Sequence, residues 1–306
     1  MRPRRELRYW APVAYVVASA VMVFSVGVPT SKDLVFVWFA IGMATFCVTD
    51  LRRRISRLVI EWLPFVAVLF VYDRLRGIAD GLVSAPHESP QIRAEAALFG
   101  KPIPTVWLQT HLWDGANHLQ WWDYLTWFVY LTHFFATLIV AAILWTWAHE
   151  RFTRFITMVC VLALTGFATY ALYPAVPPWL AAQHGSVGQS NRLIGIVWHH
   201  VPIAHYGSLF EKGQSYANNV AAMPSLHAGY ALLVTLYLWR LVPRWARPLL
   251  ALYPPAMAFA LVYSGEHYIV DCLAGWFYAT ATFVAVSRWF EWRSSRELAL
   301  EPAMAD

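Results

Sequence analysis

Apolar runs separated by short polar segments are the most regular feature of this 306-residue chain. A helix that crosses a bilayer needs about 20 predominantly apolar residues. Runs of about that length lie at 9–28, 34–50, 58–76, 124–147, 156–174, 223–241, 248–265 and 268–290. The pattern predicts an all-α, polytopic membrane helical bundle of about eight transmembrane helices.

The composition favours a membrane protein over a soluble one. Hydrophobic residues make up 59% of the chain and charged residues only 13%, whereas soluble domains average about 25% charged residues. The net charge of +5 would suggest a nucleic-acid partner in a soluble protein, but the Arg residues here lie in short loops between apolar runs. We therefore interpret the charge as a topology signal, and expect a membrane bilayer and no nucleic acid among the partners.

Loops rich in Arg alternate along the chain with loops poor in Lys and Arg. One set is rich in Arg: residues 1–8, 50–57, 149–154, 240–247 and the segment after 287. The other set is poor in Lys and Arg: residues 29–33, 77–123, 175–222 and the turn around Gly265. Basic loops stay in the cytoplasm, so we expect a plasma-membrane protein with both termini cytoplasmic and both long loops outside. The alternative for the first run is a cleaved signal peptide, which leaves the later spans in the same orientation.

A His–Asp pair, His267 and Asp271, is spaced i and i+4 at the start of the last apolar run. On a helix such side chains are neighbours. Asp271 can then accept a hydrogen bond from one imidazole nitrogen and leave the other as a nucleophile or base. The alternative is a purely structural pair, in which the two side chains only satisfy each other's hydrogen-bonding groups at the start of a helix. Ionisable groups near a bilayer are costly, which favours a functional role.

The segment Pro-Ser-Leu-His opens the sixth apolar run. Pro224 suits the first turn of a helix, whose free N–H groups bind phosphate readily, and Ser225 adds a hydroxyl donor. A protonated His227 can give a proton to a leaving oxygen. The predicted topology places this segment and the pair His267 and Asp271 at the outer face. One imidazole to attack and another to protonate suffice for phosphoryl transfer without a metal.

These motifs resemble those of a known family. MPSLHAGYA (223–231) followed by GEHYIVD (265–271) is similar to the second and third motifs of the type 2 phosphatidic acid phosphatase superfamily. A Leu where most members have Gly, the short third motif, YPAVPPW (173–179) and YLTHF (130–134) resemble the branch that contains fungal inositol phosphorylceramide synthase. The likeness covers about residues 60–290.

The resemblance implies a six-helix phosphatase-like catalytic core, which we place at 58–291, after two accessory helices in 1–57 and before a cytoplasmic tail at 292–306. It implies an integral-membrane lipid phosphatase or phosphotransferase, acting at the extracytoplasmic face on a phospholipid or polyprenyl phosphate through a phosphohistidine intermediate, with no metal and no cofactor. Water as acceptor makes the enzyme a phosphatase, and a polyol or lipid alcohol makes it a transferase. The sequence leaves both open.

The resemblance also assigns roles to the site residues. His267 would be the nucleophile and Asp271 the group that orients it. His227 would be the general acid for the leaving alcohol, and then the base for the incoming water or alcohol. Ser225 would hold a phosphoryl oxygen.

The chain departs from the superfamily at the cations that bind the phosphate. Ala260 and Leu261 stand where most members have Ser-Arg, and no clear first motif with Lys and Arg-Pro is present. The candidate replacements near the outer face are Arg74, Arg76, Arg192 and Lys212. We favour Arg76, which has Asp73 one turn back to hold it, with Lys212 as a further binding residue. The alternatives are interfacial snorkelling for Arg76 and simple solvation for Lys212.

Other histidines and other functions fit the sequence less well. His199, His200 and His205 lack the carboxylate or Cys spacing of a metal site. His133 lies within a span and is expected to be a core histidine that can contact the site. A transporter with buried ionisable residues and a non-catalytic membrane scaffold are the alternative functions. The polar groups gather at one face instead of crossing the bilayer, which favours the enzyme.

Overall fold

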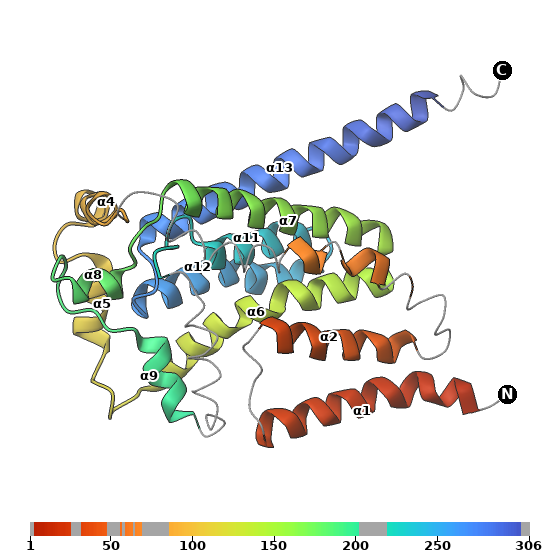
Figure 1. Ribbon diagram of the computed structural model, residues 1–306, viewed down its shortest axis with the longest axis horizontal. Coiled ribbons are helices and arrows are strands. Elements are labelled where there is room, and N and C mark those ends of the chain that lie inside the picture. The colour runs from red at the N-terminus through yellow and green to blue at the C-terminus, as the bar shows by residue number, and fades with distance from the viewer. Residues whose placement is uncertain are drawn as a thin grey trace. The chain divides into compact units, whose positions relative to one another are not determined.

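The computed structural model describes residues 3–25, 32–47, 56, 59–63, 65–68, 86–201 and 219–300. Within these ranges the chain is all-α, and β-structure is limited to two isolated bridges. The helices, shown in Figure 1, are α1 Pro3–Ser25, α2 Lys32–Cys47, α4 Ser89–Phe99, α5 Pro104–Leu112, α6 Trp121–Trp147, α7 His149–Leu172, α8 Pro178–Gln183, α9 Leu193–His200, α11 Leu226–Leu238, α12 Arg247–Tyr263 and α13 Ile269–Leu300. The predicted fold class is confirmed.

Four of the described helical segments are long and apolar enough to cross a membrane: Trp121–Trp147, His149–Leu172, Arg244–Tyr263 and Ile269–Glu297. They coincide with the fourth, fifth, seventh and eighth predicted spans. Trp10–Val23 and Leu226–Leu238 are apolar but shorter. A multi-pass membrane protein follows from these helices, while the total of about eight spans, and the orientation in the membrane, stay predictions.

The chain forms two compact units. One comprises Met1–Gly77 with Leu193–Asn218, and the other Ile78–Arg192 with Asn219–Asp306. In the first unit α1 packs on α2, and the Tyr15 hydroxyl donates to the Trp38 carbonyl at 3.0 Å. The second unit contains every candidate site residue that the structure describes. The predicted domain boundaries at 57 and 291 stay predictions.

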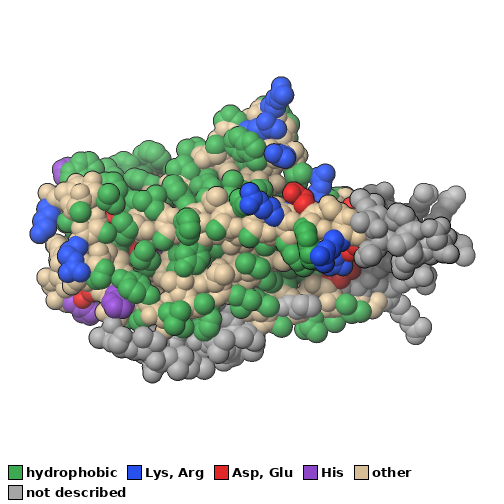
Figure 2. Space-filling model, turned by 90° about the horizontal axis from the view of Figure 1, so that it is seen from above, with side chains coloured by type: hydrophobic (Ala, Val, Ile, Leu, Met, Phe, Trp, Pro, Cys, Tyr) green, Lys and Arg blue, Asp and Glu red, His purple; other side chains and the backbone are tan. Residues whose placement is uncertain are grey.

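The second unit is a bundle in which α6, α7, α11, α12 and α13 run side by side (Figure 1). The short helix α11 lies at its centre and contacts the other four. Fully buried side chains from several of these helices fill the interior: Phe155, Met158, Leu162, Leu233 and Met257. Apolar side chains also cover the outside, and Figure 2 shows them over the middle of the visible face with Lys and Arg toward its ends. A polar solvent would disfavour such a surface, whereas a bilayer accommodates it.

The helices α11 and α13 approach one another closely because two glycines face the contact. A Cβ added at Gly275 would overlap the carbonyl oxygen of Ser225. A Cβ added at Gly229 would come within 3.1 Å of the Gly275 carbonyl oxygen. Small residues permit this close packing of membrane helices. As a result, the N-terminal turns of α11 and α13 meet.

The two predicted outer loops contain helices of their own and are joined to the bundle by backbone bonds. In Figure 1, α4, α5 and α8 gather at the end of the bundle where α13 begins. The N–H of His87 donates to the Pro174 carbonyl at 2.8 Å, and the N–H of Ala222 donates to the Ala175 carbonyl at 3.2 Å. The segment before α4 is therefore tied, through the end of α7, to the chain that enters α11.

Candidate active site

Two sequence motifs meet where α11 and α13 begin. The backbone N–H of Ser225 donates to the Asp271 carbonyl at 2.9 Å. The rings of His227 and His267 lie with their centroids 5.7 Å apart and their planes inclined by 56°. The structure thus brings together four of the predicted site residues, at the starts of two helices that are distant in sequence. Their chemical roles stay predictions.

His267 precedes the helix that carries Asp271. The sequence spacing predicted two neighbours on one helix face, but α13 begins at Ile269 and His267 lies in the turn before it. Asp271 Oδ2 accepts the N–H of Tyr268 at 2.9 Å, as an acidic residue in the first helical turn often does. The same oxygen lies 3.7 Å from His267 Nδ1, which is beyond ordinary hydrogen-bond length. Because Asp271 faces Nδ1, Nε2 is the nitrogen left for substrate.

Ser225 caps α11. Its side chain is fully buried, and its Oγ accepts the N–H of Ala228 at 3.4 Å. The prediction that Pro224 occupies the first helical turn is wrong, because the helix begins at Leu226 and Pro224 precedes the cap. The Pro224 carbonyl instead accepts a hydrogen bond from the Tyr170 hydroxyl at 2.6 Å. This bond anchors the entrance of α11 to α7.

An aromatic wall from α6 surrounds His227. The ring of Tyr130 stacks on it with centroids 5.0 Å apart, and the ring of His133 lies 3.9 Å away. Phe134 contributes an edge at 6.3 Å. The expectation that His133 contacts the site is met in the structure. The wall therefore restricts the orientation of the His227 ring.

Of the candidate cations, only Arg192 lies among the described residues. Arg74, Arg76 and Lys212 fall outside the described ranges. Arg192 Nε donates to Glu266 Oε1 at 2.8 Å, and Nη2 donates to Oε2 at 3.1 Å. Burial disfavours the charged guanidinium, but the charge and hydrogen bonds of Glu266 outweigh burial and raise the pKa of Arg192. Arg192 is therefore a permanent positive charge held beside the residue before His267.

The position of Arg192 is fixed by a residue that sequence reasoning missed. Gln109 on α5 donates to the carbonyls of Asn191 and Tyr263 at 2.9 and 2.8 Å, and its Oε1 accepts the Asn191 N–H at 2.8 Å. Gly265 has a φ of +77°, and a Cβ there would lie 2.7 Å from the Asn191 carbonyl oxygen. The segment that carries Arg192 is therefore clamped to the turn between α12 and α13. No local sequence pattern around Gln109 predicts these contacts.

Glu95 is a second residue that sequence reasoning missed. It lies on α4, in the first predicted outer loop, and is fully buried. Its Oε1 accepts the backbone N–H of Val270 at 2.9 Å. The only sequence signal was an acidic residue within an Ala-rich stretch, which is also typical of an exposed helix.

The histidines weighed as metal ligands do not form a site in the described part of the chain. No group of three His, Cys, Asp or Glu residues there is arranged to hold a metal ion. His199 and His200 are exposed at the end of α9, and His205 lies outside the described ranges. The expected absence of a metal or cofactor stays a prediction.

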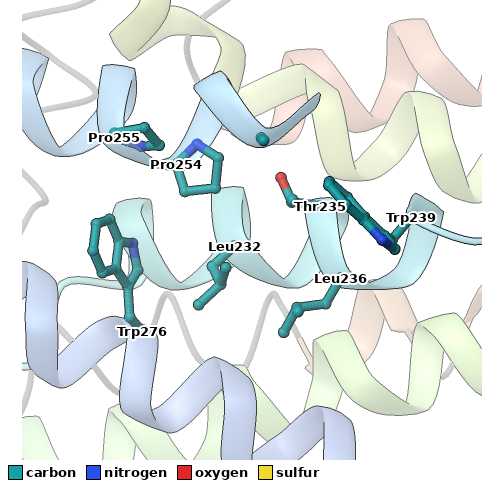
Figure 3. Close-up of a pocket in the computed structure, with 8 residues that line it drawn as sticks. Leu232, Thr235, Leu236, Trp239, Pro254, Pro255 and Trp276 are labelled. Atoms are coloured by element: carbon teal, nitrogen blue, oxygen red, sulfur yellow. The ribbon is translucent and has the colours of Figure 1, made fainter. Parts of the chain in front are cut away.

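An apolar groove of about 430 Å³ lies between α11, α12 and α13 (Figure 3). Leu232 and Leu236 of α11, Pro254 of α12 and Trp276 of α13 line it, together with further apolar side chains. Leu232 follows His227, and Trp276 follows Asp271, by five positions, or about 7.5 Å of helix rise. The groove therefore lies further along α11 and α13 than the polar cluster, and neither His227 nor Asp271 lines it.

A buried His–Asp pair, a second imidazole and a nearby guanidinium lie together at the end of a membrane bundle, a combination of groups that suits phosphoryl transfer. The family model of the PAP2 superfamily matches residues 103–285. The chain belongs to this superfamily, which confirms the resemblance noted in the sequence. It is a membrane lipid phosphatase or phosphotransferase.

A curated relative is more specific. The chain is 26% identical over 240 residues to the phosphoinositol dihydroceramide synthase of Bacteroides thetaiotaomicron, over 72% of this chain and 73% of the relative. This similarity agrees with the resemblance to the inositol phosphorylceramide synthase branch. No solved structure matches the chain.

Proposed function

We propose that the protein transfers a phosphorylated polyol head group from a phospholipid to a lipid alcohol, through a phosphohistidine on His267. The observation that carries the proposal is the pairing of the His227 and His267 rings, 5.7 Å apart, with Asp271 behind the second ring. The name of the bacterial relative supports transfer of a phosphoinositol group to a dihydroceramide-like alcohol over hydrolysis.

In the first step, Nε2 of His267 attacks the phosphorus of the donor lipid. A P–N bond forms as the P–O bond to the glycerol breaks, and His227 gives its proton to the leaving oxygen. Diacylglycerol leaves, and the head group stays on His267 as a phosphoramidate. Asp271 stabilises the positive charge that develops on the His267 ring.

In the second step, His227 acts as the base. It takes the proton of the acceptor hydroxyl, whose oxygen attacks phosphorus, and the P–N bond breaks. The product lipid carries the head group, and both histidines return to their starting protonation states. Water in place of the lipid alcohol would give hydrolysis by the same route.

Arg192 is the described cation best placed to neutralise the phosphoryl oxygens. It pairs with Glu266, lies with its guanidinium 5.0 Å from the centroid of the Trp179 ring, and is close to Tyr130, the residue that stacks on His227. Ser225 would hold a phosphoryl oxygen, and Arg76 and Lys212 stay candidates beside Arg192. The alternation of Arg-rich loops with loops poor in Lys and Arg supports a site at the extracytoplasmic face of the plasma membrane.

The test uses purified protein in mixed micelles of phosphatidylinositol and a ceramide-type alcohol, with products identified by mass spectrometry. We expect diacylglycerol and a phosphoinositol-bearing product lipid in equal amounts. His267→Ala should abolish both, while His118→Ala, which changes an exposed histidine of the outer segment, should retain activity. Diacylglycerol together with free inositol phosphate would indicate a hydrolase. Full activity of His267→Ala would reject His267 as the nucleophile.

A further inference from the structure

Glu95 reaches from the outer helix α4 to the first turn of the catalytic helix α13. Its side chain has no exposed surface, and its Oε1 accepts the Val270 N–H at 2.9 Å. Its Oε2 has no hydrogen-bond partner among the described residues. The carboxyl group therefore satisfies a free N–H at the start of α13. It does so one residue before Asp271.

Two buried carboxyl groups thus share one helix end. Asp271 is also fully buried, and one of its oxygens is occupied by the Tyr268 N–H. A helix N-terminus favours negative charge, but two anions in one buried site repel, so that one of them tends to hold a proton. Burial raises the pKa of Glu95 to about 7, and the charge of Asp271 acts in the same direction against the hydrogen bond from Val270.

Among the described residues, the other titratable groups near this pair come from α4 and the residue before it, the end of α7 and the start of α13. They are Glu88 just before α4, Arg93 on α4, Tyr173 after α7, and His267, Tyr268 and Cys272. Burial raises the pKa of both Tyr173 and Tyr268, so these phenols stay neutral near neutral pH. Ionisation of Glu95 would therefore place a second carboxylate beside Asp271 at the buried start of α13.

We propose that Glu95 is a positioning residue that acts on His267 through Asp271. While Glu95 holds a proton, a single negative charge stands behind the nucleophile and suffices to orient it. When Glu95 loses its proton to solvent, its negative charge repels the Asp271 carboxylate across the first turn of α13 and moves that carboxylate from its place behind the nucleophile. The inference rests on the proposed function, and it gives the outer helix α4 a direct influence on the reaction.

The experiment compares the pH dependence of head-group transfer, as kcat and kcat/KM from pH 5 to 9, in the wild type, Glu95→Gln and Glu150→Gln. The amide carbonyl introduced by Glu95→Gln can still accept the Val270 N–H but cannot ionise. We expect the kcat of the wild type to fall as the pH rises above about 7, by up to about tenfold at pH 8 as Glu95 ionises, and the kcat of Glu95→Gln to be retained there. Glu150→Gln, the same change at an exposed position in the first turn of α7, should keep the wild-type profile.

A second measurement needs no variant. The infrared C=O band of a protonated buried carboxyl should be present in the wild-type protein at pH 5 and disappear around pH 7, the pKa of Glu95. Its loss in Glu95→Gln assigns it. A Glu95→Gln profile that coincides with the wild type, or a wild-type spectrum without such a band, overturns the inference.

The inference and the proposed function fail in different ways. If the wild type makes no transfer product, or His267→Ala retains activity, the proposed function fails and the inference falls with it. If both behave as proposed while Glu95→Gln keeps the wild-type pH profile, only the role of Glu95 is lost and a purely structural cap is left.

Discussion

The N–H of Ser225 donates to the carbonyl of Asp271 at 2.9 Å, so a main-chain bond joins the entrances of α11 and α13. Neither side chain takes part in this bond. The distance between the His227 and His267 rings is therefore set first by the backbone and by the glycine contact between the two helices. Side-chain substitutions at positions 225 and 271 should alter chemistry while leaving this link in place.

Gly275→Ala should disrupt the site without touching a catalytic side chain. The added Cβ would overlap the Ser225 carbonyl oxygen, and overpacking of this kind costs about 1–3 kcal/mol. We expect a fall of at least about tenfold in transfer activity and a lower thermal midpoint in detergent. Gly195→Ala is the matched control, because a Cβ there meets nothing within 4 Å. Equal behaviour of the two variants would contradict the close approach of α11 and α13.

Arg192→Gln should weaken transfer by about 10–100-fold in kcat/KM, since a charged hydrogen bond to a phosphoryl oxygen is worth about 1.5–3 kcal/mol. The substitution also leaves Glu266 without its partner. The double variant Arg192→Gln with Glu266→Gln removes that unpaired charge, so it should recover stability but not activity. The control is Arg93→Gln, which changes an exposed guanidinium on α4. An unchanged kcat/KM in Arg192→Gln would show that Arg192 does not bind the phosphate and would leave Arg76 and Lys212 as the candidates.

His133→Ala and His133→Phe separate packing from proton chemistry at the aromatic wall. The His133 ring lies 3.9 Å from His227, and Ala leaves a gap that lets the His227 ring rotate. Phe refills the space but carries no nitrogen. If the wall acts by orienting His227, kcat should fall by about tenfold in the Ala variant and recover in the Phe variant. Equal losses in both would show that a nitrogen of His133 is needed.

Glu95 also makes a prediction about stability. Its pKa is about 7 in the folded protein and about 4.3 in an unfolded chain. A carboxyl whose folded-state pKa is raised stabilises the fold fully below the unfolded pKa, and that contribution is lost as the pH rises through about 7. The wild type should therefore lose stability relative to Glu95→Gln as the pH rises from 5 to 8. The difference between their free energies of unfolding should change in favour of the variant by roughly 2–3 kcal/mol at most. A difference that is constant with pH would contradict this.

The sequence predicted the parts of the molecule that are encoded locally. Long apolar runs indicated the helices α6, α7, α12 and α13, because a bilayer imposes length and composition on each span separately. The motifs with His227 and His267 were recognisable because each is short and contiguous. The assignment of Pro224 to the first helical turn failed because a cap one residue later decides where α11 begins.

The residues that complete the site were not predictable in this way. Glu95 meets Val270 across 175 positions, and Gln109 meets Tyr263 across 154. Both lie in a segment whose polar and aromatic residues lack a spanning pattern, so α4 and α5 were not expected as helices. Their function depends on tertiary contacts that no local periodicity records.

The order of the contributing segments along the chain determines when the site can assemble during synthesis. The residues of the candidate site and their supports lie on α4, α5, α6, the entrance of α11 and the first turn of α13. The first turn of α13 is made near the end of synthesis. A nascent chain that has inserted its earlier spans still lacks His267, the proposed nucleophile, and Val270, the partner of Glu95. On the proposed mechanism, transfer can start only once α13 has joined the bundle.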